Sequence, residues 1–523
     1  MLKLNRIYYI LLMIGISISL GAFAKSADKQ TLVMAQQIDN LITLDPAALF
    51  ETAAQEYAYN TYQRLLNPHK DNPGQFTSDI VRTWDVFDSG RSYIFRLFPK
   101  LYFASGNPLT AHDVVFSLRR AIRLNKAPAF LLTQFGFDSQ NIEHRIIAVD
   151  NTTVKISLSE TVAPSLFYSC LTSPVASIVD SVLLQPHLAQ DHGHMWLSKN
   201  YAGSGPYKLH AWQANNSLVL VKNEQNIQAS KAKLAKIIIR HIKEPSTQHL
   251  LLDKGDIDIA RNLLSFNNLP ADTTKVSVLR NWLKYLALNQ NNSYLSKPEV
   301  ILAIKHLIDY QQIADTILRD EVVVNQSFIP LKVMGSKYND FYQYDLIKAK
   351  ELLATAGFEA GFSINLVAKN LKLAQAIQSA LAQADIKVNI IPGDSRQVLA
   401  KFRARDFDML IATWASDYSD PHANTVAFAT NPDNSSASTS KTLAWRTNWQ
   451  QPEFNIISEE AKKELDSQKR ANLYESLQKE FLQIAPIIVL FQEVETSVIN
   501  NNVSGFELGT DSNATNYLHI SKL

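Results

Sequence analysis

The sequence predicts an α/β protein of two or three lobes, in which strands and helices alternate along the chain. Its 523 residues are too many for one compact core. A hydrophobic share of 46% and a charged share of 19% are typical of a soluble protein and exclude a disordered or fibrous chain. The third observation is a strand–helix–strand pattern, with strands expected at residues 386–391 and 409–412 and a helix at 395–405. Such a unit places its strands parallel in one sheet.

The N-terminal segment has the form of a cleaved export signal. Lys3 and Arg6 precede an apolar run at residues 7–20, and Ala22-Phe-Ala24 has the small-x-small pattern that signal peptidase reads. We therefore expect residues 1–24 to be a signal peptide. A permanent membrane anchor is the alternative, and it is disfavoured because the apolar run is shorter than the roughly 20 residues that span a bilayer.

Charge and cysteine content limit the partners and the compartment. Loss of residues 1–24 lowers the formal net charge from +2 to zero, because this segment carries two basic residues and no acidic one. A neutral chain without a long basic run gives no reason to expect nucleic acid as a partner. Cys170 is the single cysteine, so no intramolecular disulfide can form, and no cysteine follows the signal segment to carry a lipid. We expect a freely diffusing periplasmic protein of a Gram-negative cell, and not a lipoprotein.

Local patterns predict the elements of the N-terminal half. Residues 31–35 are an apolar run that indicates a strand, and residues 53–66 are expected to form a helix. Thr110 and Asp113, three positions apart, form a capping box at the start of another helix. The buried stripe of that helix is expected to consist of Val115, Leu118 and Ile122. Further strands are expected at residues 92–98, 153–158, 218–222 and 237–242.

The C-terminal half continues this alternation. Pro298 sets the backbone angle of the first turn of a helix. A second helix is expected to begin at Asp345, whose side chain can cap it, and to end at Gly357. The other expected elements are a helix at 247–254, a strand at 362–368, a helix at 471–484 and a buried strand at 487–491.

A candidate site follows the last strand of the strand–helix–strand unit. Ligands of open α/β sheets bind outside the carboxyl ends of the strands, which is where Trp414, Asp417 and Tyr418 lie. The aromatic rings exclude water, and a carboxylate in a dry place pairs strongly with a cation such as a primary ammonium group. The alternative interpretation is that Asp417, together with the segment 419–421, only builds a turn.

The segment Trp414-Ala-Ser-Asp-Tyr-Ser-Asp-Pro421 resembles the Trp-x-x-Asp-Tyr-x-Asp-Pro motif of the family 5 extracellular solute-binding proteins, the periplasmic oligopeptide- and dipeptide-binding receptors of ABC importers. Residues 103–117 resemble the family's phrase Phe-x-x-Gly-x-Pro-Leu-Thr-Ala-x-Asp-Val-Val-Phe-Ser. Residues 284–290 resemble a strand that crosses between the lobes, and Val503-Ser-Gly-Phe506 resembles the closing motif. The matches follow the family's order over nearly the whole chain.

The resemblance implies a two-lobe periplasmic binding protein of class C, a Venus-flytrap fold with an inserted subdomain. The expected division is 25–66, 199–283 and 487–523 for lobe I, 67–198 for the inserted lobe II, and 284–486 for lobe III. It also implies a receptor that captures peptides by hinge closure and delivers them to permease subunits in the inner membrane. A monomer without cofactor, metal or catalytic residues is expected.

The resemblance further implies the ligand contacts. In peptide-binding members the first aspartate of the motif holds the ligand's α-amino group, which assigns that role to Asp417. The peptide main chain would add as a strand to the protein main chain. The candidate ligand-binding residues are Asp417, Trp414, Ala415, Ser416, Tyr418, Asn289, Glu51, Thr52 and Phe491. For Phe491 a place in the core is the favoured alternative.

Other residue patterns keep alternatives open. Arg403 and Arg405 could bind a ligand carboxylate, although arginines at helix ends are usually solvated. A cluster of three histidines could bind a metal, but no carboxylate or thiolate follows at ligand spacing, and the cluster reads as an exposed loop. Its members are His187, His192 and His194.

Two rival functions remain. The same family contains receptors for metal chelates, haem, opines and sugars, and the unusual His422-Ala-Asn424 after the motif is compatible with such a ligand. A periplasmic hydrolase is the remote alternative. The sequence contains no His-Glu-x-x-His, Gly-x-Ser-x-Gly or Walker motif, and the acids Asp417 and Asp420 have no evident partner that would activate water.

Overall fold

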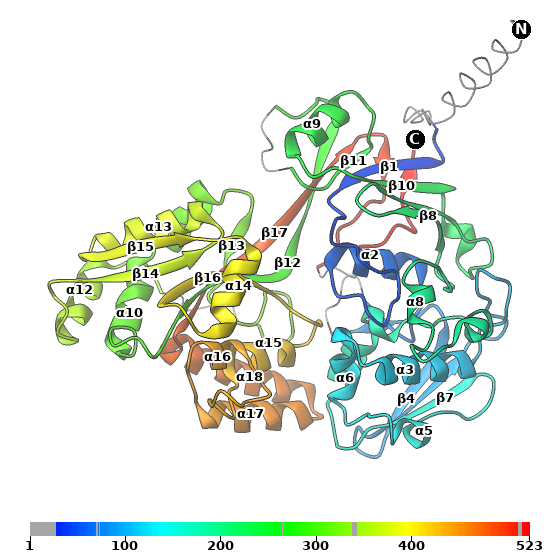
Figure 1. Cartoon of the computed structure of the whole chain (residues 1–523), viewed down its shortest axis with the longest axis horizontal. Coiled ribbons are helices and arrows are strands. Elements are labelled where there is room, and N and C mark those ends of the chain that lie inside the picture. The colour runs from blue at the N-terminus through cyan, green and yellow to red at the C-terminus, as the bar shows by residue number, and fades with distance from the viewer. Residues whose placement is uncertain are drawn as a thin grey trace, which may run out of the picture.

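The computed structural model describes residues 28–69, 72, 74–263, 266, 268–336, 342–510 and 515–523. The expected signal peptide lies outside these residues. Two large bodies stand side by side and are joined by two long strands (Figure 1). None of the helices in the described part of the chain combines the length and apolarity needed to cross a bilayer.

One mixed sheet runs through both bodies. Its strands are β1 (Thr31–Gln36), β8 (Tyr207–Gln213), β9 (Ser217–Lys222), β10 (Lys236–His241), β11 (Ile259–Ala260), β12 (Thr273–Leu288), β13 (Val322–Val324), β14 (Phe362–Ala368), β15 (Ile386–Pro392), β16 (Met409–Ala415) and β17 (Ile487–Asn500). Among the described residues the order is β15-β14-β16-β12-β17-β11-β1-β10-β9-β8, and β13 pairs with β17. The sheet is therefore continuous from one body to the other.

The connection between the bodies is the antiparallel pair β12 and β17. Their ladder runs from Thr273 opposite Asn500 to Ala287 opposite Ile487, with an irregularity between Leu279 and Leu283. One end of the pair carries β11 and the other end carries β16. An interrupted ladder bends more easily than a regular one, so this pair is placed to act as a hinge.

Lobe I contains the first core. It packs β1, β9 and β10 against α2 (Thr52–Thr61), and residues 503–520 of the C-terminal segment complete it. Short helices α7 (Ser181–Leu184) and α8 (His194–Leu197) also contribute, and α9 (Pro245–Asp253) lies at the sheet's other face.

Lobe II is a smaller body below lobe I in Figure 1. Its sheet, in the order β4-β5-β7-β6, packs against α3 and α6. The capping box of Thr110 and Asp113 begins α3 and the predicted stripe is buried, so both predictions are confirmed. The elements are β4 (Val81–Phe87), β5 (Ser92–Leu97), α3 (Ala111–Leu124), α4 (Phe130–Thr133), α5 (Ile142–Arg145), β6 (Ile146–Ala148), β7 (Thr153–Ser157) and α6 (Pro164–Leu171).

Lobe III is built on β14, β15 and β16, which are mutually parallel with β14 in the middle. The strand–helix–strand prediction is therefore confirmed. Helices α10 (Pro298–Leu307), α12 (Leu346–Thr355) and α13 (Leu371–Ala382) cover one face. Helices α14 (Ser395–Ala404), α15 (Pro421–Ala429), α16 (Leu443–Arg446), α17 (Pro452–Lys463) and α18 (Ser467–Ile484) lie on the other.

The hydrophobic cores place two lobe boundaries differently from the expected ones. The core of lobe II ends at Ile178, because Val179, Leu184 and Leu197 pack into the core of lobe I. The segment 487–491 packs in the cores of lobe III and not in that of lobe I. The reason is that β17 belongs to lobe III at its start and reaches lobe I only at its far end.

Candidate ligand-binding site

A free strand edge lies at the carboxyl end of β16. Strand β14 pairs with β16 only as far as Ala368 opposite Ile411, and the described chain has no strand on that side of residues 412–415. Helices α13 and α14 begin here on opposite faces of the sheet. This is the switch point of an α/β sheet, where ligands of such folds bind.

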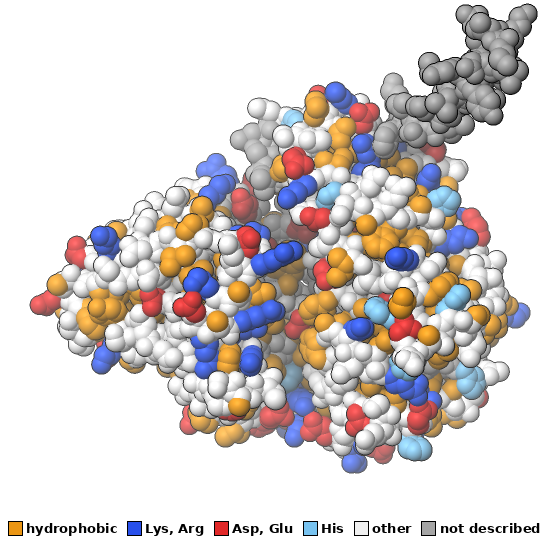
Figure 2. All heavy atoms as spheres, viewed as in Figure 1, with side chains coloured by type: hydrophobic (Ala, Val, Ile, Leu, Met, Phe, Trp, Pro, Cys, Tyr) orange, Lys and Arg blue, Asp and Glu red, His pale blue; other side chains and the backbone are white. Residues whose placement is uncertain are grey.

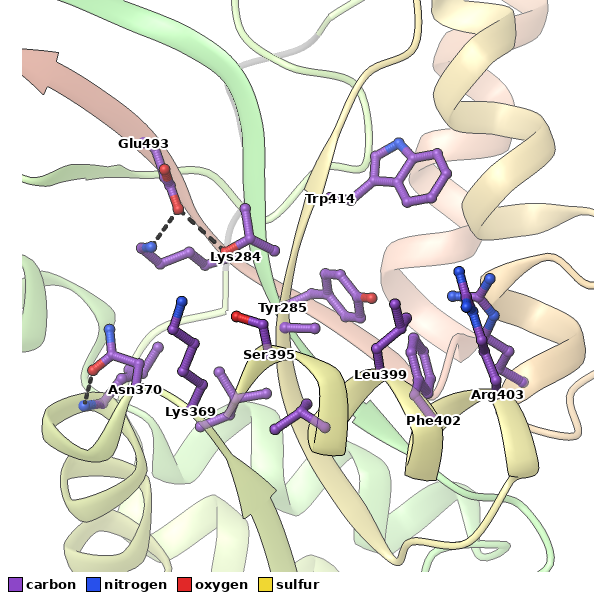
Figure 3. Close-up of a pocket in the computed structure, with 16 residues that line it drawn as sticks. Lys284, Tyr285, Lys369, Asn370, Ser395, Leu399, Phe402, Arg403, Trp414 and Glu493 are labelled. Atoms are coloured by element: carbon purple, nitrogen blue, oxygen red, sulfur yellow. Dashed lines mark hydrogen bonds and ion pairs between the residues drawn. The ribbon is translucent and has the colours of Figure 1, made fainter. Parts of the chain in front are cut away.

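A pocket of about 720 Å³ surrounds this free edge (Figure 3). Its apolar wall includes Tyr285, Leu373, Val398, Leu399, Phe402 and Trp414. Its charged lining consists of Lys284, Lys369, Arg403, Arg446 and Glu493. We call this cavity the edge pocket. It offers an apolar surface with an excess of positive charge.

A wider groove of about 790 Å³ adjoins the edge pocket and shares Lys284, Lys369 and Glu493 with it. Lobe I contributes Gln36 and Thr52 to the opposite wall, and the hinge strands form the floor. Figure 2 shows basic side chains along the hollow between the two bodies. The two cavities together form one groove between the lobes.

Asp417 lies just beyond β16 and is partly buried. Burial raises the pKa of its carboxyl to about 7. Within the described residues no side chain or backbone group donates a hydrogen bond to this carboxylate, and no cation pairs with it. A carboxylate held in this way is a candidate for a ligand cation, because a positive partner favours its charged form.

Residues 418–421 hold lobe III against lobe II. Tyr418 is 6% exposed and packs into the core of lobe II. The hydroxyl of Ser169 on α6 donates to the carbonyl of Ser419 over 3.2 Å. Asp420 pairs with Arg470 at 2.7 Å and caps α15. The turn interpretation thus accounts for Asp420 but not for Asp417, which takes no part in these contacts.

Of the motif residues, Trp414 lines the edge pocket, whereas Asp417 is beyond the lining residues of both cavities. Ala415 pairs with Trp282 of β12. The hydroxyl of Ser416 donates to Asn424 over 2.7 Å, and Asn424 donates to the carbonyl of Phe328. The segment His422-Ala-Asn424 therefore supports the site from behind.

Asn289 requires a correction. Strand β12 is antiparallel to β16, so its carboxyl end lies beside Met409, where β16 begins, at the opposite end of the strands from the candidate site. The Asn289 side chain donates to the carbonyl of Phe407 over 2.8 Å and accepts from Asn448. The residue is 4% exposed and stabilises a loop away from the groove.

Of three further residues that were expected to bind the ligand, one lies in the core, one lines the groove and one precedes a helix. Phe491 is fully buried against Tyr310 in the core of lobe III, so the alternative core interpretation describes it. Thr52 lines the interlobe groove. Glu51 precedes α2, and its carboxylate accepts from the amide of Phe50 over 3.3 Å.

Arg405, a candidate for a ligand carboxylate, and the three histidines, candidates for a metal, instead contact other residues of the protein. The guanidinium of Arg405 stacks on Trp445 at 3.4 Å, away from the edge pocket. His187 stacks on Trp196, the backbone carbonyl of His192 accepts from Arg120, and the ring of His194 lies 2.7 Å from Asp45. The part of the chain that the structure describes holds no cluster of three metal-binding side chains.

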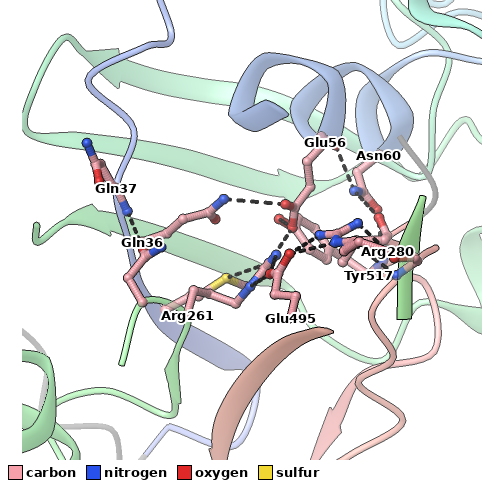
Figure 4. Close-up of polar contacts among 12 residues, drawn as sticks. Gln36, Gln37, Glu56, Asn60, Arg261, Arg280, Glu495 and Tyr517 are labelled. Carbon is pink, nitrogen blue, oxygen red and sulfur yellow. Dashed lines mark hydrogen bonds and ion pairs between the residues drawn. The ribbon is translucent and has the colours of Figure 1, made fainter. Parts of the chain in front are cut away.

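A buried charged network that the sequence analysis did not predict borders the wider groove, which Arg261, Arg280 and Glu495 line (Figure 4). Arg261 bridges Glu56 of α2 and Glu495 of β17, with 2.8 Å to each. Arg280 of β12 donates its Nε to the second oxygen of Glu495 over 2.6 Å. Tyr517 donates to Glu56 over 2.5 Å. The sequence showed Glu495 only as one of two acids, with Glu493, in the polar middle of a strand whose first five residues are apolar.

The raised pKa of Asp417 predicts a pH dependence of stability. A carboxyl group whose pKa is higher in the folded state loses stability as the pH rises from about 4 to 7. Asp417→Asn removes this loss, so the variant's advantage in free energy of unfolding should be about 2–3 kcal/mol greater at pH 8 than at pH 5. Urea unfolding at both pH values measures it. For the exposed control Asp253→Asn, the difference in free energy of unfolding from wild type should be the same at pH 5 and at pH 8. If Asp417→Asn also shows no change in this difference between the two pH values, the carboxylate of Asp417 is not buried.

Comparisons with known proteins agree with this fold. Residues 75–436 match the family model of bacterial extracellular solute-binding proteins, family 5 middle. The probable D,D-dipeptide-binding periplasmic protein DdpA of Escherichia coli K12 is 28% identical over 494 residues, which cover 91% of each chain. The glutathione-binding protein GsiB of the same strain is 24% identical over 96% of each chain. The structure of the periplasmic binding protein DppA from Helicobacter pylori with the peptide STSA superposes with a TM-score of 0.75, at 25% identity, over 94% of this chain and 98% of that one.

Proposed function

Because this chain belongs to the family 5 bacterial extracellular solute-binding proteins, we propose that it is the periplasmic receptor of an ABC importer and that its ligand is a short peptide. The names of its relatives support this ligand class, since DdpA is described as a dipeptide-binding protein and DppA was solved with a tetrapeptide. The permease subunits of the inner membrane are the proposed partners. The protein would act as a monomer released from its signal peptide.

The observation that carries the proposal is Asp417. A partly buried carboxylate with a pKa of about 7 stands at the end of a strand whose edge is free. A peptide added to that edge would form main-chain hydrogen bonds with residues 412–415, which bind peptides without regard to their side chains. Its amino group would lie at Asp417 and restore the charged form of this carboxylate.

Capture would occur by closure about the hinge of β12 and β17. Lobe I supplies one wall of the groove and lobe III the other, so a bound peptide touches both lobes only in the closed state. A ligand shifts the equilibrium by no more than its difference in affinity for the two states. The ion pair of Glu160 with Lys462, at 2.7 Å, already joins lobes II and III. Closure would therefore bring lobe I and lobe III together.

A receptor role without catalysis fits the two acids of the motif. Asp420 accepts hydrogen bonds from both terminal nitrogens of Arg470 at 2.7 and 2.8 Å, and this arginine helps to hold the pKa of Asp420 below its ordinary value despite burial. Asp420 is thus a poor general base, because its lone pairs are occupied by a permanent cation. The pair Asp417 and Asp420 lacks the free second carboxylate that a hydrolase would use.

The proposal is tested by comparing a tetrapeptide with its N-acetylated form in isothermal titration calorimetry. The free amino group should be required, and acetylation should weaken binding at least tenfold, because it removes the cation that pairs with Asp417. Native mass spectrometry of protein purified without unfolding should show bound species with peptide masses. Equal affinity for both forms would contradict the assignment of the amino group to Asp417. A bound species whose mass is not that of a peptide would show that the ligand belongs to another class.

A further inference from the structure

Lobe II and lobe III touch, although the chain passes from one to the other through lobe I. Lobe II is fixed to lobe I, because Arg120 of α3 and Asp45 of lobe I form a buried ion pair at 2.6 Å. Leu65 and Leu66 of lobe I also pack into the core of lobe II. Lobe III is connected to this combined body through the hinge strands β12 and β17. Contacts between lobe II and lobe III are therefore the ones that an opening motion about the hinge has to break.

Glu160 of lobe II lies between two lysines of lobe III. One of its carboxylate oxygens is 2.7 Å from the Nζ of Lys462, and the other is 3.3 Å from the Nζ of Lys463. The hydrogen bond from Lys462 lowers the pKa of Glu160, so this carboxylate is charged at neutral pH. The backbone amide of Ala163 donates to the carbonyl of Lys462 over 2.8 Å. The end of α17 is thus held against the start of α6 by ion pairs and by a main-chain hydrogen bond.

Helix α6, at the side of lobe II that faces lobe III in Figure 1, continues this contact. The hydroxyl of Ser165 accepts a hydrogen bond from Arg470 of α18 over 3.0 Å. One turn later, the hydroxyl of Ser169 donates to the carbonyl of Ser419 over 3.2 Å. Tyr418 packs into the core of lobe II. We call this set of contacts the clasp; its members are Glu160, Ala163, Ser165 and Ser169 of lobe II and Tyr418, Ser419, Lys462, Lys463 and Arg470 of lobe III.

The clasp has the properties of an interface that can separate. Most of its contacts are polar, and a cavity of about 60 Å³ is lined by both serines of α6 and by residues 419–421. Interfaces of this kind between domains of one chain resemble transient protein–protein contacts. The side chains of Glu160 and Lys463 are 38% and 47% exposed, so water can replace their ion pair. The clasp can therefore break while each lobe stays folded.

The clasp borders the candidate ligand site. Tyr418 and Ser419 directly follow Asp417 in the chain. Burial and, to a smaller extent, the nearby charges of Asp420 and Asp417 raise the pKa of the Cys170 thiol on α6. Asp417 therefore lies close to lobe II, and lobe II helps to exclude water from its carboxylate while the clasp is engaged, as it is in this structure.

We propose that lobe II holds lobe III in the closed state through the clasp, with Glu160 as its ionic element, so that the strength of this contact sets how long a ligand remains in the groove. The part that concerns the ligand rests on the proposed function. Opening has to break the ion pairs and hydrogen bonds of the clasp, so a stronger clasp lowers the population of the open state and slows release. A purely structural contact would stabilise the fold and leave the opening unchanged.

The first test measures opening in the absence of ligand. Glu160→Lys places a third positive charge beside Lys462 and Lys463, so the repulsion should separate lobe II from lobe III. Small-angle X-ray scattering of the ligand-free variant should give a larger radius of gyration than that of ligand-free wild type. The triple variant Glu160→Lys, Lys462→Glu and Lys463→Glu exchanges the charges and should return the radius to the wild-type value.

The second test measures release of the apolar tetrapeptide Ala-Leu-Leu-Ala by stopped-flow fluorescence, because Trp414 lines the edge pocket and reports its occupancy. Glu160→Gln should release the peptide about threefold faster than wild type, and Glu160→Lys about tenfold faster. Glu143→Gln is the matched control, since Glu143 forms its ion pairs with Arg119 and Arg123 inside lobe II. This control should leave both the radius and the release rate unchanged. Circular dichroism melts verify that each variant is folded.

The outcomes separate this inference from the proposed function. If Glu160→Lys keeps the wild-type radius, or if the exchanged charges do not restore it, the clasp is overturned and the peptide receptor stands. If wild type binds no peptide, the proposed function fails, and the radius of Glu160→Lys still decides whether lobe II holds lobe III. If the triple variant does not fold, Glu160→Gln and Lys462→Gln together should increase the radius by less than the sum of their separate effects. Additive effects on the radius would overturn the clasp.

Discussion

Asp417→Ala is expected to weaken the binding of a tetrapeptide with a free amino end by about 2–5 kcal/mol, which is roughly 30-fold to several thousand-fold in Kd. The reason is that the ligand's ammonium would be enclosed without a counter-charge, since no other acid of the described segment 414–421 is free. Isothermal titration calorimetry at pH 8, where the carboxylate is charged, measures the change. The loss should be smaller at pH 5, where the raised pKa already leaves most of the wild-type carboxyl groups protonated.

Two further variants test whether the loss of affinity is caused by the charge of Asp417. Asp417→Asn retains the shape of the side chain and should lose nearly as much affinity, because the charge is what pairs with the ammonium. Asp253→Asn on the exposed surface of α9 should bind as wild type does. Wild-type affinity in Asp417→Ala would mean that the amino end of the ligand lies elsewhere.

Glu495→Gln is expected to reduce the free energy of unfolding by about 3–5 kcal/mol, because it leaves Arg261 and Arg280 buried with one carboxylate fewer. The two arginines are 4% and 0% exposed, so water cannot replace the lost oxygen. Urea unfolding at pH 7 measures the loss. The exposed control Glu359→Gln should change stability by less than about 0.5 kcal/mol.

The same network has a defined pH dependence. Arg280 and Arg261 lower the pKa of Glu495 to about 2, against the opposing effect of burial. A carboxyl group with a lowered pKa contributes stability above its ordinary value near 4.5 and loses it as the pH falls toward 2. The difference between wild type and Glu495→Gln should therefore shrink between pH 4.5 and pH 2. A difference that stays constant over this range would show that Glu495 does not carry its charge in the folded protein.

Helix starts were predicted correctly where the sequence signal comes from residues next to the helix. The capping box at Thr110 and the N-cap at Asp345 lie where the sequence placed them, because such caps depend on residues two to three positions away. The helix predicted from 471 begins earlier, at Ser467, because Asp466 caps it, and α2 ends at Thr61 and not at 66. These errors are of boundary and not of type.

The sequence by itself determined the alternation of strands and helices, the parallel arrangement around β16 and the candidate carboxylate Asp417, since periodicity, caps and one motif are written in neighbouring residues. Only the tertiary structure decided that Asn289 lies at the opposite end of the strands from the groove and that Glu495 joins two arginines. Each of these depends on strand direction or on a contact between residues far apart in the chain. The physical reason is that side-chain patterns report which face of an element is buried, whereas the pairing of charges across the groove arises only once the lobes and the hinge strands are assembled.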